Sequence, residues 1–173
     1  MSAELPRVLT ALLQAWNDHA PFARFPAARE LTPLRLHPWL PNLVFIDLQP
    51  TARKRFHVRL MGAHLAEALG HDLTGTNFDA GGMVTGQAAR LRPLYLCLFS
   101  GRPIYTRTPG EALGLGGGIV DQLTLPCRGK GHDIAHLIVA GYPTLSKRAD
   151  HRTTQDHQAW REPLSTPHGH AVL

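Results

Sequence analysis

The first side chains to weigh for covalent or metal chemistry are two cysteines, Cys97 and Cys127. A catalytic thiol needs a neighbouring base and an electropositive setting, but Cys97 lies in the apolar run YLCLF and Cys127 at the end of a predicted strand. Two thiols cannot make a disulfide scaffold or a zinc site with several thiolates. We therefore expect Cys97 to be a small core residue, and this cysteine usage favours a reducing cytoplasm.

Two other features fail the test for catalysis. The glycine run from Gly114 to Gly118 lacks the Lys-Ser/Thr ending of a phosphate-binding loop, and it precedes a strand instead of a helix. Asp47 is a carboxylate in an apolar strand with no partner acid, so we expect it at the outer sheet face or paired with an arginine. The sequence therefore predicts no catalytic residue and no metal site, and we do not expect an enzyme.

The charge balance excludes little, but its distribution is informative. The chain of 173 residues carries 18 Lys and Arg against 13 Asp and Glu, and the basic residues gather at 53–59 and 90–107. Neither zone is interleaved with aromatic residues for base stacking, so we expect solvent-facing charges and no nucleic-acid partner. No apolar run reaches about 18 residues and no secretory signal is visible, so no membrane association is predicted.

The hydrophobic pattern predicts the elements that position these residues. Apolar residues from Leu5 to Trp16 recur on one face of a helix. Further helices are predicted at 62–69 and 84–100, with a break at Pro93. Strands are predicted at 42–48, 56–61, 103–108, 118–126 and 134–142.

Five strands joined mostly by hairpins predict one antiparallel sheet with helices on one face, an α+β fold. We divide the chain into an N-terminal amphipathic helix at 1–20, the α+β domain at 21–145 and a polar, flexible tail at 146–173.

Four sequence blocks within this pattern are familiar: HPWLPNLVFIDL at 37–48, RFHVRLMGAHLAEALGHDLTG at 55–75, SGRPIYTR at 100–107 and VDQLTLPC at 120–127. Together they resemble the bacterial PAS-domain proteins of the PAS_5 subgroup, of the alphaproteobacterial type, over roughly residues 5–142. The resemblance implies a PAS-like five-stranded sheet of order 2-1-5-4-3. It also implies a cytoplasmic sensor or adaptor in bacterial signal transduction that binds a small ligand or a partner protein. The alternatives are a ligand-free interaction module and a haem-based redox or gas sensor.

The resemblance leaves the cofactor unknown. Some haem-binding PAS domains carry the iron ligand in the helical region that faces the sheet, which directs attention to His64 and His71. We expect both to face solvent or to cap a helix, because His64 need not share the face of Leu65 and Leu69. Flavin is disfavoured because no cysteine-bearing photoreceptor motif is evident.

A small-molecule pocket, if present, is expected between the sheet and its helices. Strand alternation predicts that Phe56, Val58 and Leu60 share a covered face, and Tyr105 and Gln122 are the polar residues that could orient a ligand. A solid core without a cavity is the alternative. The candidate lining residues are Phe56, Val58, Leu60, Leu65, Leu69, Leu94, Leu98, Tyr105, Gln122, Leu123 and Leu125.

The N-terminal apolar stripe has two equally plausible uses. It could form a homodimer interface, or it could pack on the sheet of its own chain. The candidate interface residues are Leu5, Val8, Leu9, Leu12, Leu13 and Trp16.

Overall fold

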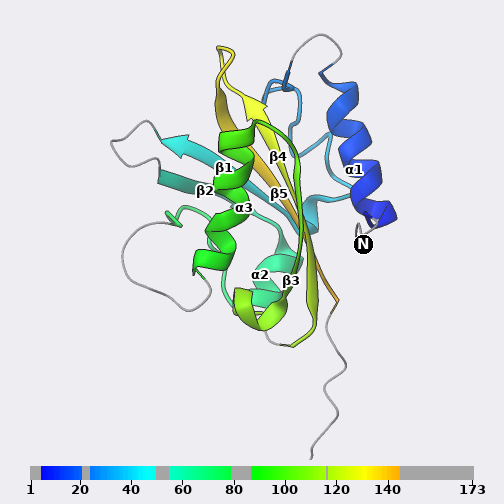
Figure 1. The fold of residues 1–173 in the computed structure, drawn as a ribbon, viewed down its shortest axis with the longest axis vertical. Helices are drawn as coiled ribbons and strands as arrows, with labels where there is room; N and C mark the ends of the chain where they lie inside the picture. Colours follow the sequence, from blue (N-terminus) through cyan, green and yellow to red (C-terminus); the bar gives the residue numbers. More distant parts are fainter. Residues whose placement is uncertain (1–4, 21–23, 50–54, 79–86, 116, 145–173) are drawn as a thin grey trace, which may run out of the picture.

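A five-stranded antiparallel sheet is the centre of the computed structural model, which describes residues 5–20, 24–49, 55–78, 87–115 and 117–144 (Figure 1). Its strands run in the order β2-β1-β5-β4-β3 and are β1 (Leu43–Gln49), β2 (Arg55–Met61), β3 (Ile104–Pro109), β4 (Ile119–Arg128) and β5 (Ile134–Thr144). The helical elements are α1 (Arg7–Asp18), η1 (Leu40–Asn42), α2 (Ala63–Leu69), α3 (Gln87–Ser100) and η2 (Gly110–Leu113). The α+β fold and the strand order are confirmed. The predicted tail at 146–173 lies outside the described residues.

The strands alternate between two buried faces of the sheet. Phe45 of β1 points to the face covered by α1, which we call the α1 face, whereas Ile46 points to the face covered by α2 and α3, the α3 face. Figure 1 shows α3 (green) crossing the strands, with α1 (blue) on the other side of the sheet. Both faces are therefore covered, one by the pair of internal helices and the other by the N-terminal helix.

Helix α1 packs on the sheet of its own chain. Leu9 and Leu12 are fully buried and Trp16 nearly so, within one cluster that also contains Leu123 and Leu125 of β4. The Trp16 indole Nε1–H donates a hydrogen bond to the Pro126 carbonyl oxygen at 2.9 Å. The structure thus shows the apolar stripe packed on the sheet of its own chain. The buried residues of the stripe are therefore not exposed to a second copy.

A bulge in β2 changes the expected alternation. Phe45 pairs with Leu60, but the next residue, Ile46, pairs with Val58, so Arg59 is the extra residue in β2. A bulge of this kind shifts the following side chain to the opposite face. Val58 consequently lies on the α3 face and Leu60 packs on the α1 face. The prediction that Leu60 shares a face with Phe56 and Val58 is therefore wrong.

The break expected at Pro93 is also wrong, because α3 runs through it from Gln87 to Ser100. A proline inside a helix removes one backbone donor and its ring crowds the carbonyl of the preceding turn, but here Pro93 is buried together with Leu94 and Cys97. Packing on the sheet thus outweighs one missing hydrogen bond. The helix ends where the sequence predicted, at Gly101, whose positive φ of 60° and N–H bond to the Cys97 carbonyl close the last turn.

Candidate functional site

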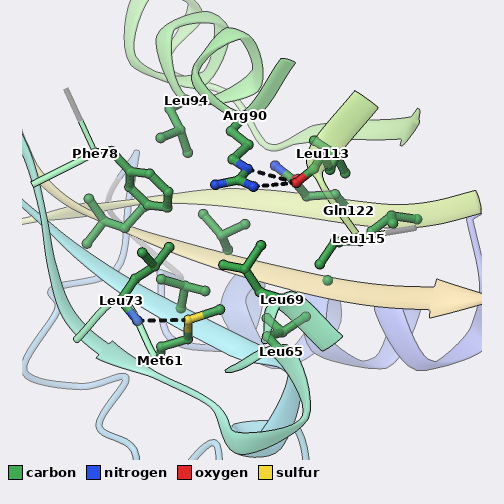
Figure 2. Close-up of a pocket in the computed structure, with 15 residues that line it drawn as sticks. Met61, Leu65, Leu69, Leu73, Phe78, Arg90, Leu94, Leu113, Leu115 and Gln122 are labelled. Carbon is green, nitrogen blue, oxygen red and sulfur yellow. Dashed lines mark hydrogen bonds between the residues drawn. The ribbon is translucent and has the colours of Figure 1, made fainter. Parts of the chain in front are cut away.

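A cavity of about 90 Å³, partly open to solvent, lies between the α3 face of the sheet and the helices. Strands β1, β4 and β5 form its floor, and α2, α3 and η2 surround it (Figure 2). The lining residues are Val44, Ile46, Met61, Leu65, Leu69, Leu73, Phe78, Arg90, Leu94, Leu113, Leu115, Val120, Gln122, Val139 and Gly141.

The wall next to α2 depends on a short polar turn. The Asp72 carboxylate accepts hydrogen bonds from the Thr74 backbone N–H at 2.8 Å and from its hydroxyl at 2.7 Å, and Gly75 adopts a positive φ of 81°. The Thr74 backbone N–H also lowers the pKa of Asp72. This turn holds Leu73 against the cavity, where its N–H points to the Met61 sulfur at 3.4 Å. Asp72 and Gly75 therefore stabilise the turn beside the cavity.

Among the lining residues that the structure describes, Arg90 is one of two with polar side chains and the only one that is charged. It extends from the start of α3 toward the cavity, and its Nε–H and Nη2–H groups both donate to the Leu113 carbonyl oxygen, at 2.9 and 2.5 Å (Figure 2). Partial burial lowers the pKa of the Arg90 guanidinium, but an arginine remains cationic at neutral pH. The side chain thus joins α3 to η2 and brings a positive charge to an otherwise apolar pocket.

Gln122 is the second polar side chain of the lining, on the floor of the cavity. It is 9 % exposed, and its Nε2 donates to the Thr124 hydroxyl at 3.3 Å. Its ladder partner on β3 is Thr106, whose buried hydroxyl has no hydrogen-bond partner among the described residues. Among the described residues of the floor, Gln122 is therefore the polar side chain that lines the cavity.

The structure brings four of the eleven predicted pocket residues to the cavity: Leu65, Leu69, Leu94 and Gln122. Phe56 and Val58 lie in the hydrophobic cluster of the same face but do not line the cavity, and neither does the half-buried Leu98. The remaining four, Leu60, Tyr105, Leu123 and Leu125, pack on the α1 face.

Arg90 is the polar lining residue that the sequence analysis missed, because it was assigned to a basic zone facing solvent. A usable signal exists: Arg90 precedes Leu94 by four positions, so both lie on the same side of α3. Leu113 and Leu115, which also line the cavity, belong to a segment predicted only as a loop.

The two cysteines lack the setting of a nucleophile. Burial raises the pKa of Cys97 to about 12 and that of Cys127 to about 12. Both side chains have no measurable exposure, so the thiolate that would react is absent at neutral pH. The expectation that Cys97 is a core residue is confirmed.

Histidines do not reach the cavity within the described residues. His64 is exposed, and its Nδ1 lies 3.1 Å from the Asn42 side-chain oxygen. His136 pairs with Asp47 at 2.8 Å, and the Arg59 guanidinium lies 3.7 Å from the same carboxylate. Asp47 is therefore paired with an arginine, as one of its two predicted arrangements required. The described part of the chain contains no group of three side chains that could hold a metal ion.

A five-stranded antiparallel sheet of order 2-1-5-4-3, with α2 and α3 over a cavity on one face, defines a PAS-like α+β domain. The family model PAS_5, a PAS domain, matches residues 6–89, from α1 to the beginning of α3. Over these residues the match confirms the resemblance drawn from the sequence. No curated protein matches the chain. Among the described residues, no helix has both the length and the apolar character needed to cross a membrane.

Proposed function

We propose that this protein is a signalling sensor that binds a small molecule in the cavity between the α3 face and helices α2 and α3. The cavity itself is the observation that supports the proposal, because small-molecule sites are concave, mostly apolar and equipped with a few polar groups. The lining has this composition, with Arg90 and Gln122 as its polar members. Haem is not favoured as the ligand, since the lining offers no histidine or cysteine to iron.

The same arrangement suggests how occupancy would be transmitted. A ligand in the cavity would touch α2, α3, η2 and four strands at once. A ligand shifts a conformational equilibrium only through contacts that differ between the two states. Helix α3 contributes Arg90 and Leu94 to the lining, so α3 is the element that we expect to respond.

The test is a screen of neutral chemical fragments by ligand-detected NMR on the full chain and on two matched variants. Leu69→Trp fills the cavity from α2, whereas Leu96→Trp makes the same change on α3 at a side chain that is 44 % exposed and outside the lining. We expect Leu69→Trp to abolish fragment binding and Leu96→Trp to retain it. Hydrogen exchange should slow in α3 when a fragment binds. Absence of any fragment binding to the unaltered protein would overturn the proposal.

Self-association is a second candidate function, in which the protein works as an interaction module without a ligand. The supporting observation is Phe99 on α3, which is 80 % exposed and stacks on Tyr95 with ring centroids 6.1 Å apart. Exposed aromatic side chains are enriched in protein interfaces. Light scattering over a range of protein concentrations should show a homodimer that Phe99→Ser dissociates, and a monomer throughout would exclude this candidate.

A further inference from the structure

The charge of the cavity narrows the class of ligand. Arg90 contributes a positive charge, and no carboxylate balances it among the described residues of the lining. The arginine–carboxylate pairs found among the described residues are those of Arg59 with Asp47 and of Arg107 with Asp121, both on the α1 face. A partly desolvated cation without a counter-ion carries a free-energy cost that an incoming anion would offset.

The geometry of the guanidinium points to a carboxylate as that anion. Of its five N–H donors, one on Nε and one on Nη2 bind the Leu113 carbonyl oxygen. These two bonds fix the plane of the group, and they leave Nη1 with no hydrogen-bond partner among the described residues. In Figure 2 the guanidinium lies over the cavity, between Phe78 and Leu113. A planar group with free N–H donors binds a carboxylate through charge-assisted hydrogen bonds.

The rest of the lining determines the body of the ligand. Apart from Arg90 and Gln122, every lining residue is apolar or glycine. The cavity of about 90 Å³ is several times the roughly 10–15 Å³ that a single water molecule requires. It therefore accommodates a short hydrocarbon chain, while its open side allows a longer chain to extend into solvent.

We propose that the ligand is a small carboxylate with an apolar body, whose anionic group pairs with Arg90 and whose chain lies among the leucines of the cavity. This inference rests on the proposed ligand-binding function, which it deepens by naming the ligand class. Gln122 would then be available to a second oxygen on the ligand.

The experiment measures binding of hexanoate and of its neutral isostere hexanamide at pH 7 by isothermal titration calorimetry, using the full chain. Butanoate and octanoate extend the series in length. We expect hexanoate to bind at least about tenfold more tightly than hexanamide, which corresponds to about 1.4 kcal/mol. Arg90→Gln should remove this preference, so that hexanoate and hexanamide bind to the variant with equal affinity. Arg90→Lys should retain part of it, because the charge remains without the planar fork.

Arg92→Gln is the matched control, because Arg92 lies on the same helix, is exposed and does not line the cavity. It should leave the hexanoate preference intact. Hexanamide binding also serves as the control for folding, since Arg90 holds η2 through Leu113 and its loss could open the cavity. If Arg90→Gln weakens both probes equally, Arg90 is only a structural tie and the inference is overturned.

Three further outcomes would also overturn this inference, and the first two show whether the proposed function fails with it. Equal binding of hexanoate and hexanamide, or binding of neutral fragments without any binding of carboxylates, would overturn the carboxylate assignment and leave the sensor function standing. Failure of both carboxylates and neutral fragments to bind would overturn both. A preference for hexanoate that persists in Arg90→Gln but disappears in Arg92→Gln would place the anion outside the cavity and would likewise overturn the inference.

Discussion

Replacement of Leu12 by alanine tests whether α1 is part of the domain core. Leu12 is 0 % exposed and lies in the cluster on the α1 face with Leu9, Trp16 and residues of β4 and β5. The substitution removes three buried carbon atoms, which accounts for about 2 kcal/mol at roughly 0.8 kcal/mol per methylene. The cavity left behind raises the total, so we expect the free energy of unfolding to fall by about 3 to 4 kcal/mol, within the usual range for buried leucines.

Urea unfolding followed by circular dichroism measures this change, and light scattering measures the oligomeric state of the same samples. Leu13→Ala is the matched control, because Leu13 is the next residue of the helix and only half-buried. It should cost less than half as much as Leu12→Ala. Both variants should have the oligomeric state of the unaltered protein.

The reasoning fails if Leu12→Ala converts a dimer into a monomer of unchanged stability. That result would show that the apolar stripe joins two copies and that the packing of α1 on its own sheet contributes little. Equal losses for Leu12→Ala and Leu13→Ala would also contradict it, because the two side chains differ in burial.

Three further predictions concern Gly62, which precedes α2, the two buried thiols, and Tyr105. A methyl group in Gly62→Ala would overlap the backbone carbonyl oxygens of η1, so thermal melting should show a loss of more than about 2 kcal/mol. Burial raises the pKa of Cys97 and Cys127 to about 12, so the folded thiols stay protonated while unfolded ones ionise from about pH 9. Urea unfolding should therefore show a free energy of unfolding that does not change with pH below pH 9. Between pH 9 and 12 this free energy should fall by about 1 kcal/mol per pH unit for each thiol. Tyr105→Phe removes a hydroxyl that donates to the buried Asp121 carboxylate at 2.5 Å, and chemical denaturation should show a loss of about 1–3 kcal/mol.

Each of these has a result that would count against it. A Gly62→Ala protein that melts with the unaltered one would mean that β2 and η1 can move apart at little cost. For the thiols, the slope above pH 9 should become shallower in Cys97→Ala, and an unchanged slope would assign it to other groups. Tyr105→Phe with full stability would show that Arg107, 3.6 Å from Asp121, satisfies the carboxylate alone.

The order of elements could be predicted from sequence because each strand and helix carries its own period. Alternation along β4, for example, correctly placed Leu123 and Leu125 on one face of the strand. Alternation cannot say which of two faces that is when both are buried. In this sheet the cavity lies on the face of Gln122, whereas Leu123 and Leu125 face α1.

Two further physical reasons explain why only part of the pocket could be predicted from the sequence. The bulge at Arg59 depends on the pairing of β1 with β2, which no single strand encodes, and it moved Leu60 out of the predicted set. Arg90 joins the cavity only because the Leu113 carbonyl binds its guanidinium across 23 residues of chain. The four-residue spacing from Leu94 places Arg90 on the same side of α3, but it cannot predict this tertiary hydrogen bond to Leu113.

The two thiols lie in separate hydrophobic clusters, Cys97 on the α3 face and Cys127 on the α1 face. Each thiol can react only when the layer that buries it opens, so the alkylation rate of each thiol reports the opening of one side of the sheet. Pulse alkylation followed by mass spectrometry would measure the opening rates of the two layers independently in a single unlabelled sample. A molecule that enters the cavity should slow the alkylation of Cys97 more than that of Cys127. This difference would distinguish a local effect on α3 from a rise in the stability of the whole domain.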